Sequence, residues 1–130
     1  MVKVWVNGCF DILHRGHVEL FKYAKSLGDH LKVGLDSDWK VRKVKGTERP
    51  INRELDRAAL VRCIEYVDEV AIFHNAQELG WYIKDYGPDV LVVGSDWKDK
   101  KVVGAEHAGR VEFFNRIAEY STTKIIEKLR

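Results

Sequence analysis

Two patterns of hydrophobic and polar positions alternate along the chain. Short apolar runs rich in β-branched residues predict buried strands at residues 2–6, 31–35, 67–73, 89–93 and 111–114. Between them, apolar residues recur with helical spacing, which predicts helices over residues 16–27, 54–66, 76–86 and 122–129. The polar and basic stretch 36–52 contains Gly46 and Pro50, so we expect mainly loop or a short helix there.

The alternation of strands with helices predicts the class of fold. We expect a Rossmann-like, doubly wound α/β domain with a mainly parallel five-stranded sheet and helices on both faces. The chain has 130 residues with no linker or repeat, so residues 1–130 are expected to form a single domain. Ligands of such sheets bind beyond the carboxyl ends of the strands, which directs attention to the loops after the first, second and fourth strands.

Composition narrows the classes of function. Hydrophobic residues make up 45% of the chain, enough for a core, which argues against disorder. Lys plus Arg is 22 and Asp plus Glu is 20, and this near balance argues against a general nucleic-acid-binding protein. Cys9 and Cys63 have no metal-site spacing and predict reduced thiols. Without a signal-peptide pattern or a long apolar run, we expect a cytoplasmic protein with no membrane partner.

Two histidines follow the first predicted strand, at the start of the first predicted helix. His14 and His17 can donate N–H bonds to phosphate oxygens, and the helix N-terminus adds backbone donors. Gly16 between them leaves room for a ligand to approach closely. A pair of surface histidines is one alternative and a shared metal is another. No cluster of further ligands completes a metal site, so we predict no protein metal ligand.

The other candidate residues lie in the remaining loops at this edge. The basic segment, residues 42–50, either forms a solvated face or closes over phosphates, with Lys45 as the expected contact. Trp97 after the fourth strand either stacks on a nucleotide base or packs half-buried. Ser121 is expected to cap the last helix, whose free backbone N–H groups are a second place for phosphate.

Two segments near the ends of the chain resemble the motifs of one enzyme family. Residues 8–17 read GCFDILHRGH and resemble the G-x-F-D-x-x-H-x-G-H signature of the cytidylyltransferase-like nucleotidyltransferases. Residues 120–125 read YSTTKI and resemble the family's second motif, I-S-[ST]-T-x-I. The resemblance implies transfer of a nucleotidyl group from a nucleoside triphosphate to a phosphorylated acceptor, with release of pyrophosphate. It also implies Mg²⁺ with the triphosphate and a homodimer.

The resemblance also assigns roles to individual residues. It makes His14 and His17 catalytic residues, and Lys45 of the basic segment is expected to act with them. Without it, Arg57 and Arg116 are ordinary surface charges, and Asp11 is a residue that orients the histidine loop or caps a turn. The nucleotide-binding residues that it implies are Gly8, Cys9, Phe10, Asp11, Gly16, Arg57, Gly94, Asp96, Trp97, Arg116, Ser121, Thr122 and Thr123.

The chain shares features with two subfamilies that differ in substrate. Its length, Trp97 in the stretch Gly94–Trp97, and Arg116 resemble the glycerol-3-phosphate cytidylyltransferases, although Glu65 replaces an arginine of that group. The main expectation is therefore transfer of CMP from CTP to a phosphorylated alcohol, glycerol 3-phosphate, giving CDP-glycerol.

Three other segments resemble the adenylyltransferase domain that makes ADP-heptose. They are residues 7–14, NGCFDILH; residues 45–50, KGTERP; and residues 103–105, VGA. The alternative expectation is an adenylyltransferase that uses ATP and a sugar 1-phosphate. A nucleotide-binding module without catalysis remains a further alternative.

Overall fold

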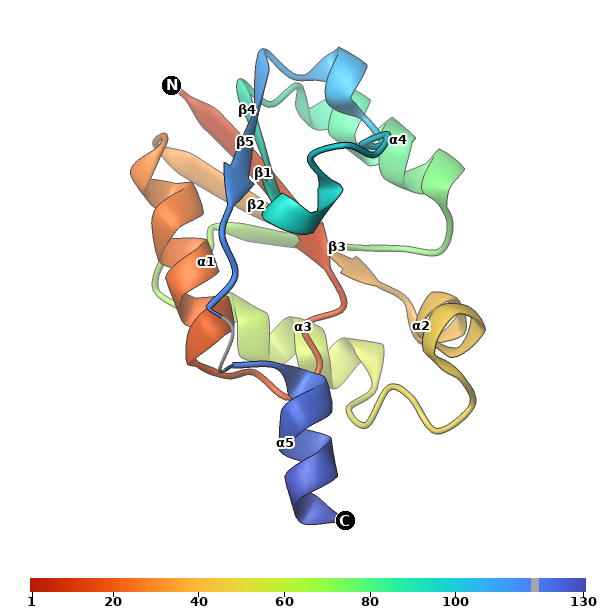
Figure 1. Ribbon diagram of the computed structural model, residues 1–130. Helices are drawn as coiled ribbons and strands as arrows, with labels where there is room; N and C mark the ends of the chain where they lie inside the picture. The colour runs from red at the N-terminus through yellow and green to blue at the C-terminus, as the bar shows by residue number, and fades with distance from the viewer. Residues whose placement is uncertain (118–119) are drawn as a thin grey trace.

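The computed structural model describes residues 1–117 and 120–130 and contains a five-stranded sheet with helices on both faces (Figure 1). All strand pairs are parallel, in the order β3-β2-β1-β4-β5, so the expected Rossmann-like α/β fold is confirmed. The strands are β1 (Lys3–Gly8), β2 (His30–Asp36), β3 (Glu69–Phe73), β4 (Val90–Gly94) and β5 (Arg110–Phe114). The helices are α1 (Arg15–Ser26), α2 (Asp38–Lys45), α3 (Glu54–Arg62), α4 (Ala76–Tyr86) and α5 (Thr122–Leu129), with short 3-10 turns η1 (Ser95–Trp97) and η2 (Ala105–His107).

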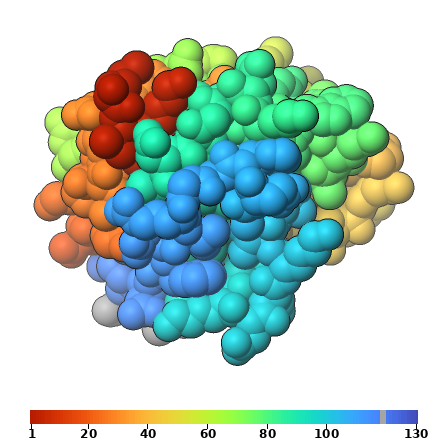
Figure 2. Space-filling model, turned by 90° about the horizontal axis from the view of Figure 1, so that it is seen from above, coloured from red at the N-terminus to blue at the C-terminus, as the bar shows by residue number. Residues whose placement is uncertain are grey.

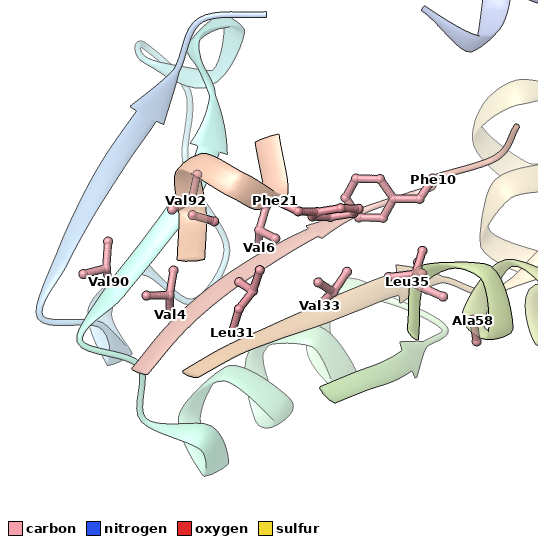
Figure 3. Close-up of a cluster of buried hydrophobic side chains, with 12 residues drawn as sticks. Val4, Val6, Phe10, Phe21, Leu31, Val33, Leu35, Ala58, Val90 and Val92 are labelled. Atoms are coloured by element: carbon pink, nitrogen blue, oxygen red, sulfur yellow. The ribbon is translucent and has the colours of Figure 1, made fainter. Parts of the chain in front are cut away.

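Side chains of the central strand alternate between two hydrophobic clusters. Val4 and Val6 of β1 face α1 and α3, where they pack in one cluster with Phe21 and other fully buried residues (Figure 3). Trp5 points to the opposite face and packs with Ile83 of α4. Successive strand residues point to opposite faces, and both faces are covered, which explains why the strand sequences are apolar throughout.

Different segments of the chain lie at the amino ends and at the carboxyl ends of the strands. At the amino ends, the backbone N–H of Lys3 donates to the Asp89 carboxylate at 2.8 Å, and Figure 2 shows the N-terminal residues beside the surface around β4. At the carboxyl ends lie the loop between β1 and α1, the start of α2, η1 and the approach to α5 (Figure 1). The loops that the sequence pattern singled out therefore meet at one edge of the sheet.

The structure refines two segments of the sequence prediction. Residues 38–45 form a short helix, one of the two alternatives expected for this stretch, and it is capped at Ser37, whose hydroxyl accepts from the Lys40 N–H. Lys45 thus ends a helix and does not lie in a loop. The helix predicted to reach residue 66 ends at Arg62, and Ile64, which lies beyond its end, packs partly buried against the core before β3. None of the helices among residues 1–117 and 120–130 is long and apolar enough to cross a membrane.

Candidate active site

The loop between β1 and α1 is held in an unusual backbone conformation. Phe10 and Ile12 have positive φ angles of 52° and 47°, a region that residues with side chains seldom adopt. The Phe10 ring packs on Phe21 at 4.9 Å between centroids and against the edge of His17 at 5.4 Å. A Cβ on Gly8 would come within 3.0 Å of the Phe10 ring. Close packing therefore fixes this loop beneath the histidines.

His14 and His17 form the N-terminal capping box of α1. His14 is the N-cap, and its Nδ1 accepts a hydrogen bond from the Gly16 N–H at 3.0 Å. His17 Nδ1 accepts from the backbone N–H of His14 at 3.2 Å. Because Nδ1 is an acceptor in both rings, the proton of each neutral imidazole lies on Nε2. Both rings thus keep one N–H donor for a ligand.

Burial and neighbouring cations keep these imidazoles neutral. Desolvation by burial is the largest of the causes that lower the pKa of His17 to about 3. Coulombic repulsion from His14, Arg116 and Lys45 also lowers this pKa, and Asp11 opposes the shift. Desolvation also lowers the pKa of His14. At neutral pH the site therefore offers neutral donors from the histidines, and its positive charge comes from Lys and Arg.

A cavity of about 240 Å³ opens between the two histidines and the start of α5. Thirteen of the residues expected to act in catalysis or nucleotide binding line it: Gly8, Cys9, Phe10, Asp11, His14, Gly16, His17, Lys45, Gly94, Arg116, Ser121, Thr122 and Thr123. The tertiary structure thus brings together residues from both ends of the chain, as a shared phosphate site requires.

Hydrogen bonds attach the start of α5 to the histidine loop. The Thr122 hydroxyl donates to the backbone carbonyl of Asp11 at 2.5 Å. Ser121 is the N-cap, as predicted, and its hydroxyl accepts from the Lys124 N–H at 3.0 Å. Two helix N-termini, those of α1 and α5, therefore border one cavity, and both favour negative charge.

Arg57 is a correction to the expected set. It is fully buried, and its guanidinium donates to the carbonyls of Cys9, Asp36 and Asn52 and to the Asp38 carboxylate at 2.8–3.0 Å. These four bonds occupy the guanidinium beneath the cavity. Arg57 therefore holds the loops after β1 and β2 together. Its geometry does not indicate direct contact with a nucleotide.

The segment after β4 is also placed differently from the expectation. Asp96 and Trp97 are absent from the described residues that line the cavity. Asp96 instead pairs with Arg116 at 3.3 Å, and Trp97 is 42% exposed, with the Lys100 ammonium 5.4 Å from its ring centroid. Of this stretch only Gly94 lines the cavity, where an added Cβ would clash with Asp96 and crowd Arg116.

Three polar residues line the cavity without having been predicted as site residues: Asn7, Arg49 and Tyr120. The Tyr120 ring lies parallel to His14 at 6.3 Å between centroids. Arg49 belongs to the basic segment, and Tyr120 directly precedes Ser121. Their position beside predicted site residues was the one feature of the sequence that could have identified them. Neither residue type is specific enough by itself to identify a site.

The described residues contain no group of three or more His, Cys, Asp or Glu side chains able to hold a metal ion. Asp11 lines the cavity and is 1% exposed, but its carboxylate accepts from the backbone N–H groups of Ile51 at 2.6 Å and Asn52 at 2.9 Å. That carboxylate therefore anchors the end of the basic segment.

Comparison with known proteins agrees with this geometry. Residues 5–128 match the family model described as Cytidylyltransferase-like. The chain is 46% identical over 127 residues to the bifunctional protein HldE of Campylobacter fetus, and 48% identical over 129 residues to that of Nitratiruptor. These alignments cover 98% of this chain, which spans only about a quarter of the length of those relatives, 28% and 27%.

A solved structure shares the fold over nearly the whole chain. The crystal structure of a lipopolysaccharide core biosynthesis protein from Thermoplasma volcanium superimposes with a TM-score of 0.74 at 28% identity, covering 93% of this chain and 99% of that one. The matched family model, the two signature segments and their convergence on one cavity agree. The chain belongs to the cytidylyltransferase-like family of nucleotidyltransferases.

Proposed function

We propose that this domain is an adenylyltransferase that transfers AMP from ATP to the phosphate of a sugar 1-phosphate. An oxygen of the sugar phosphate forms a bond to the α-phosphorus of ATP. The bond from that phosphorus to its bridging oxygen breaks, and pyrophosphate leaves with the electron pair. The observation that carries this proposal is the pair of neutral imidazoles whose Nε2 atoms carry the proton, at a cavity that Lys45 and Arg116 also line.

The relatives favour ATP and a sugar phosphate over the main expectation from sequence. The similar HldE proteins point to an adenylyltransferase of the ADP-heptose type and not to CDP-glycerol synthesis. The segments 7–14 and 45–50, which resemble the ADP-heptose group, both contribute residues to the cavity. Trp97 was the residue that favoured CTP and glycerol 3-phosphate, and it is not among the described residues that line the cavity.

The residues suit a reaction governed by positioning and charge. The attacking oxygen belongs to a phosphate that is already ionised, so no side chain has to remove a proton from it. Negative charge grows on the phosphoryl oxygens and the leaving pyrophosphate, where fixed donors stabilise the transition state more than the ground state. His14 and His17 supply such donors through Nε2–H, Lys45 and Arg116 supply positive charge, and the start of α5 supplies backbone N–H groups.

Mg²⁺ enters this proposal as part of the metal–nucleotide substrate. The Asp11 carboxylate is engaged by two backbone donors, and the described residues hold no cluster of metal ligands. The residues present therefore do not fit a metal held by the protein itself. Any Mg²⁺ would be bound by triphosphate oxygens and water.

The test has a binding step and a turnover step. Thermal shifts with ATP, CTP, GTP and UTP rank the nucleotides, because a ligand that binds only the folded state raises its melting temperature. Pyrophosphate release is then measured with heptose 1-phosphate, hexose 1-phosphates and glycerol 3-phosphate. We expect ATP with a sugar 1-phosphate to give the fastest turnover. Faster turnover of CTP with glycerol 3-phosphate contradicts the proposal, and nucleotide binding without any turnover supports the non-catalytic alternative.

A further inference from the structure

Arg49 carries a guanidinium that is only partly paired by the residues that the structure describes. Its side chain is only 12% exposed and lines the cavity. Two of its buried nitrogens, Nε and Nη2, have no hydrogen-bond partner among the described residues. Buried polar groups are nearly always paired in native proteins, and an unpaired charged donor is unfavourable. An unsatisfied guanidinium at the wall of a cavity therefore points to a ligand that is absent from the free protein.

The neighbouring carboxylate does not satisfy this guanidinium. Asp11 Oδ2 lies 3.7 Å from Arg49 Nε, beyond hydrogen-bond distance. The same oxygen accepts the Ile51 N–H at 2.6 Å, and Asp11 Oδ1 accepts the Asn52 N–H at 2.9 Å. Asp11 thus fixes the backbone on which Arg49 stands and partly balances its charge. Both nitrogens keep their protons, but they are buried, so a ligand reaches them only when the Arg49 side chain turns toward the cavity.

The two free nitrogens belong to one edge of the guanidinium. Nε and Nη2 present parallel N–H groups, the arrangement that pairs with two oxygens of one phosphate. A lysine cannot reproduce this fork, because an ammonium acts as a point charge. The chemistry therefore selects an anion with paired oxygens.

The position of Arg49 distinguishes it from Arg116, one of the two cations beside the histidines. Lys45 and Arg116 lie close enough to His17 to lower its pKa. Arg49 stands beside Asp11, on the segment between α2 and α3, whereas Arg116 follows β5 on the far side of β1. In an in-line displacement the attacking and leaving groups lie on opposite sides of the α-phosphorus, so the acceptor phosphate needs a cation separate from those that hold the leaving group.

We propose that Arg49 binds the phosphate of the acceptor substrate through the Nε and Nη2 edge of its guanidinium. This inference rests on the proposed function, in which the acceptor is a sugar 1-phosphate. Arg49 then determines specificity for a phosphorylated acceptor and orients the attacking oxygen. It contributes little to the affinity for ATP.

The experiment compares Arg49→Lys and Arg49→Gln with Arg53→Gln, which makes the same change at an exposed arginine four residues later. Heptose 1-phosphate binding is measured by calorimetry with a non-hydrolysable ATP analogue present, and the analogue's own affinity is measured separately. We expect Arg49→Gln to weaken heptose 1-phosphate at least tenfold, a loss on the order of that for a charge-assisted pair. Arg49→Lys, which keeps the charge beside Asp11, should weaken it less and melt near the wild-type temperature. The analogue's affinity should change less than twofold in every variant.

The remaining outcomes distinguish failure of the Arg49 proposal from failure of the proposed function. Unchanged heptose 1-phosphate binding in Arg49→Gln overturns the role of Arg49 and leaves the proposed function standing. Weaker binding of the ATP analogue instead places Arg49 at the triphosphate and also overturns it. If the wild-type protein binds the ATP analogue but neither binds nor turns over any sugar 1-phosphate, the proposed function fails, and the role of Arg49 fails with it.

Discussion

The imidazole rings of His14 and His17 stack with their centroids 3.8 Å apart and their planes inclined by 22°. Each ring uses Nδ1 to accept a backbone N–H at the start of α1. One pair of side chains therefore both caps a helix and faces a cavity. Stability and catalysis can be separated only by substitutions that keep the caps.

Substitutions with His14→Asn and His17→Gln make this separation. Asparagine is a good N-cap and glutamine is a usual third residue of a capping box, so α1 should keep its start. Each variant loses an Nε2–H donor, and we expect pyrophosphate release to fall by roughly 10²–10³-fold, as for loss of one transition-state donor. Melting temperatures should stay within a few degrees of the wild type. Full turnover in both variants would show that the imidazoles are needed only as caps.

The lowered pKa of His17 makes stability depend on pH. The unfolded chain protonates this imidazole near pH 6.5, whereas the folded protein does so only near pH 3. Between these values the unfolded state binds more protons, so stability that is present above pH 6.5 is lost as the pH falls toward 3. One proton contributes at most about 1.4 kcal/mol per pH unit. Denaturant titrations from pH 4 to 7 should show a flatter profile for His17→Gln than for wild type, and parallel profiles would contradict this assignment.

Removal of the buried guanidinium of Arg57 should lower the stability of the fold, because this side chain has a structural role. Arg57→Met leaves three backbone carbonyls and the Asp38 carboxylate without their donor. We expect the free energy of unfolding to fall by about 3–5 kcal/mol, as for a broken buried ion pair. Arg62→Met on the exposed end of α3 is the control and should change it by less than about 0.5 kcal/mol. Urea titration measures both, and weaker ATP binding at wild-type stability would restore Arg57 to the nucleotide site.

Two helical glycines should respond oppositely to alanine. A Cβ on Gly16 would lie 2.8 Å from the His14 ring and 3.1 Å from Tyr120 Cβ, so Gly16→Ala displaces the stacked rings. A small displacement of catalytic groups is enough to reduce turnover by up to about 10²-fold. At Gly80 of α4 the nearest atom is 4.0 Å away, so Gly80→Ala should stabilise the protein by about 0.5–1 kcal/mol without changing turnover. Comparison of kcat and melting temperature tests both, and normal kcat in Gly16→Ala would show that the rings tolerate movement.

The local sequence was sufficient where a residue's role depends on its neighbours in the chain. The apolar runs and helical periods predicted the five strands and four of the helices, and Ser121 was identified as a cap from its place before Thr122. For the stretch that contains Lys45, the sequence left a loop and a short helix as alternatives, and packing of Val41 in the core supports the helix. The order β3-β2-β1-β4-β5 depends on long-range pairing and was not predicted.

The sequence by itself determined the α/β class, the two phosphate-binding segments and their family, because periodicity and motifs are properties of adjacent residues. Only the tertiary structure decided which arginines face the cavity. Arg57 and Arg49 look alike in sequence, but Arg57 donates to backbone carbonyls, whereas two nitrogens of Arg49 have no hydrogen-bond partner in the part of the chain that the structure describes. That difference arises from which carbonyls the folded chain places within hydrogen-bond distance, and segments far apart in sequence supply them.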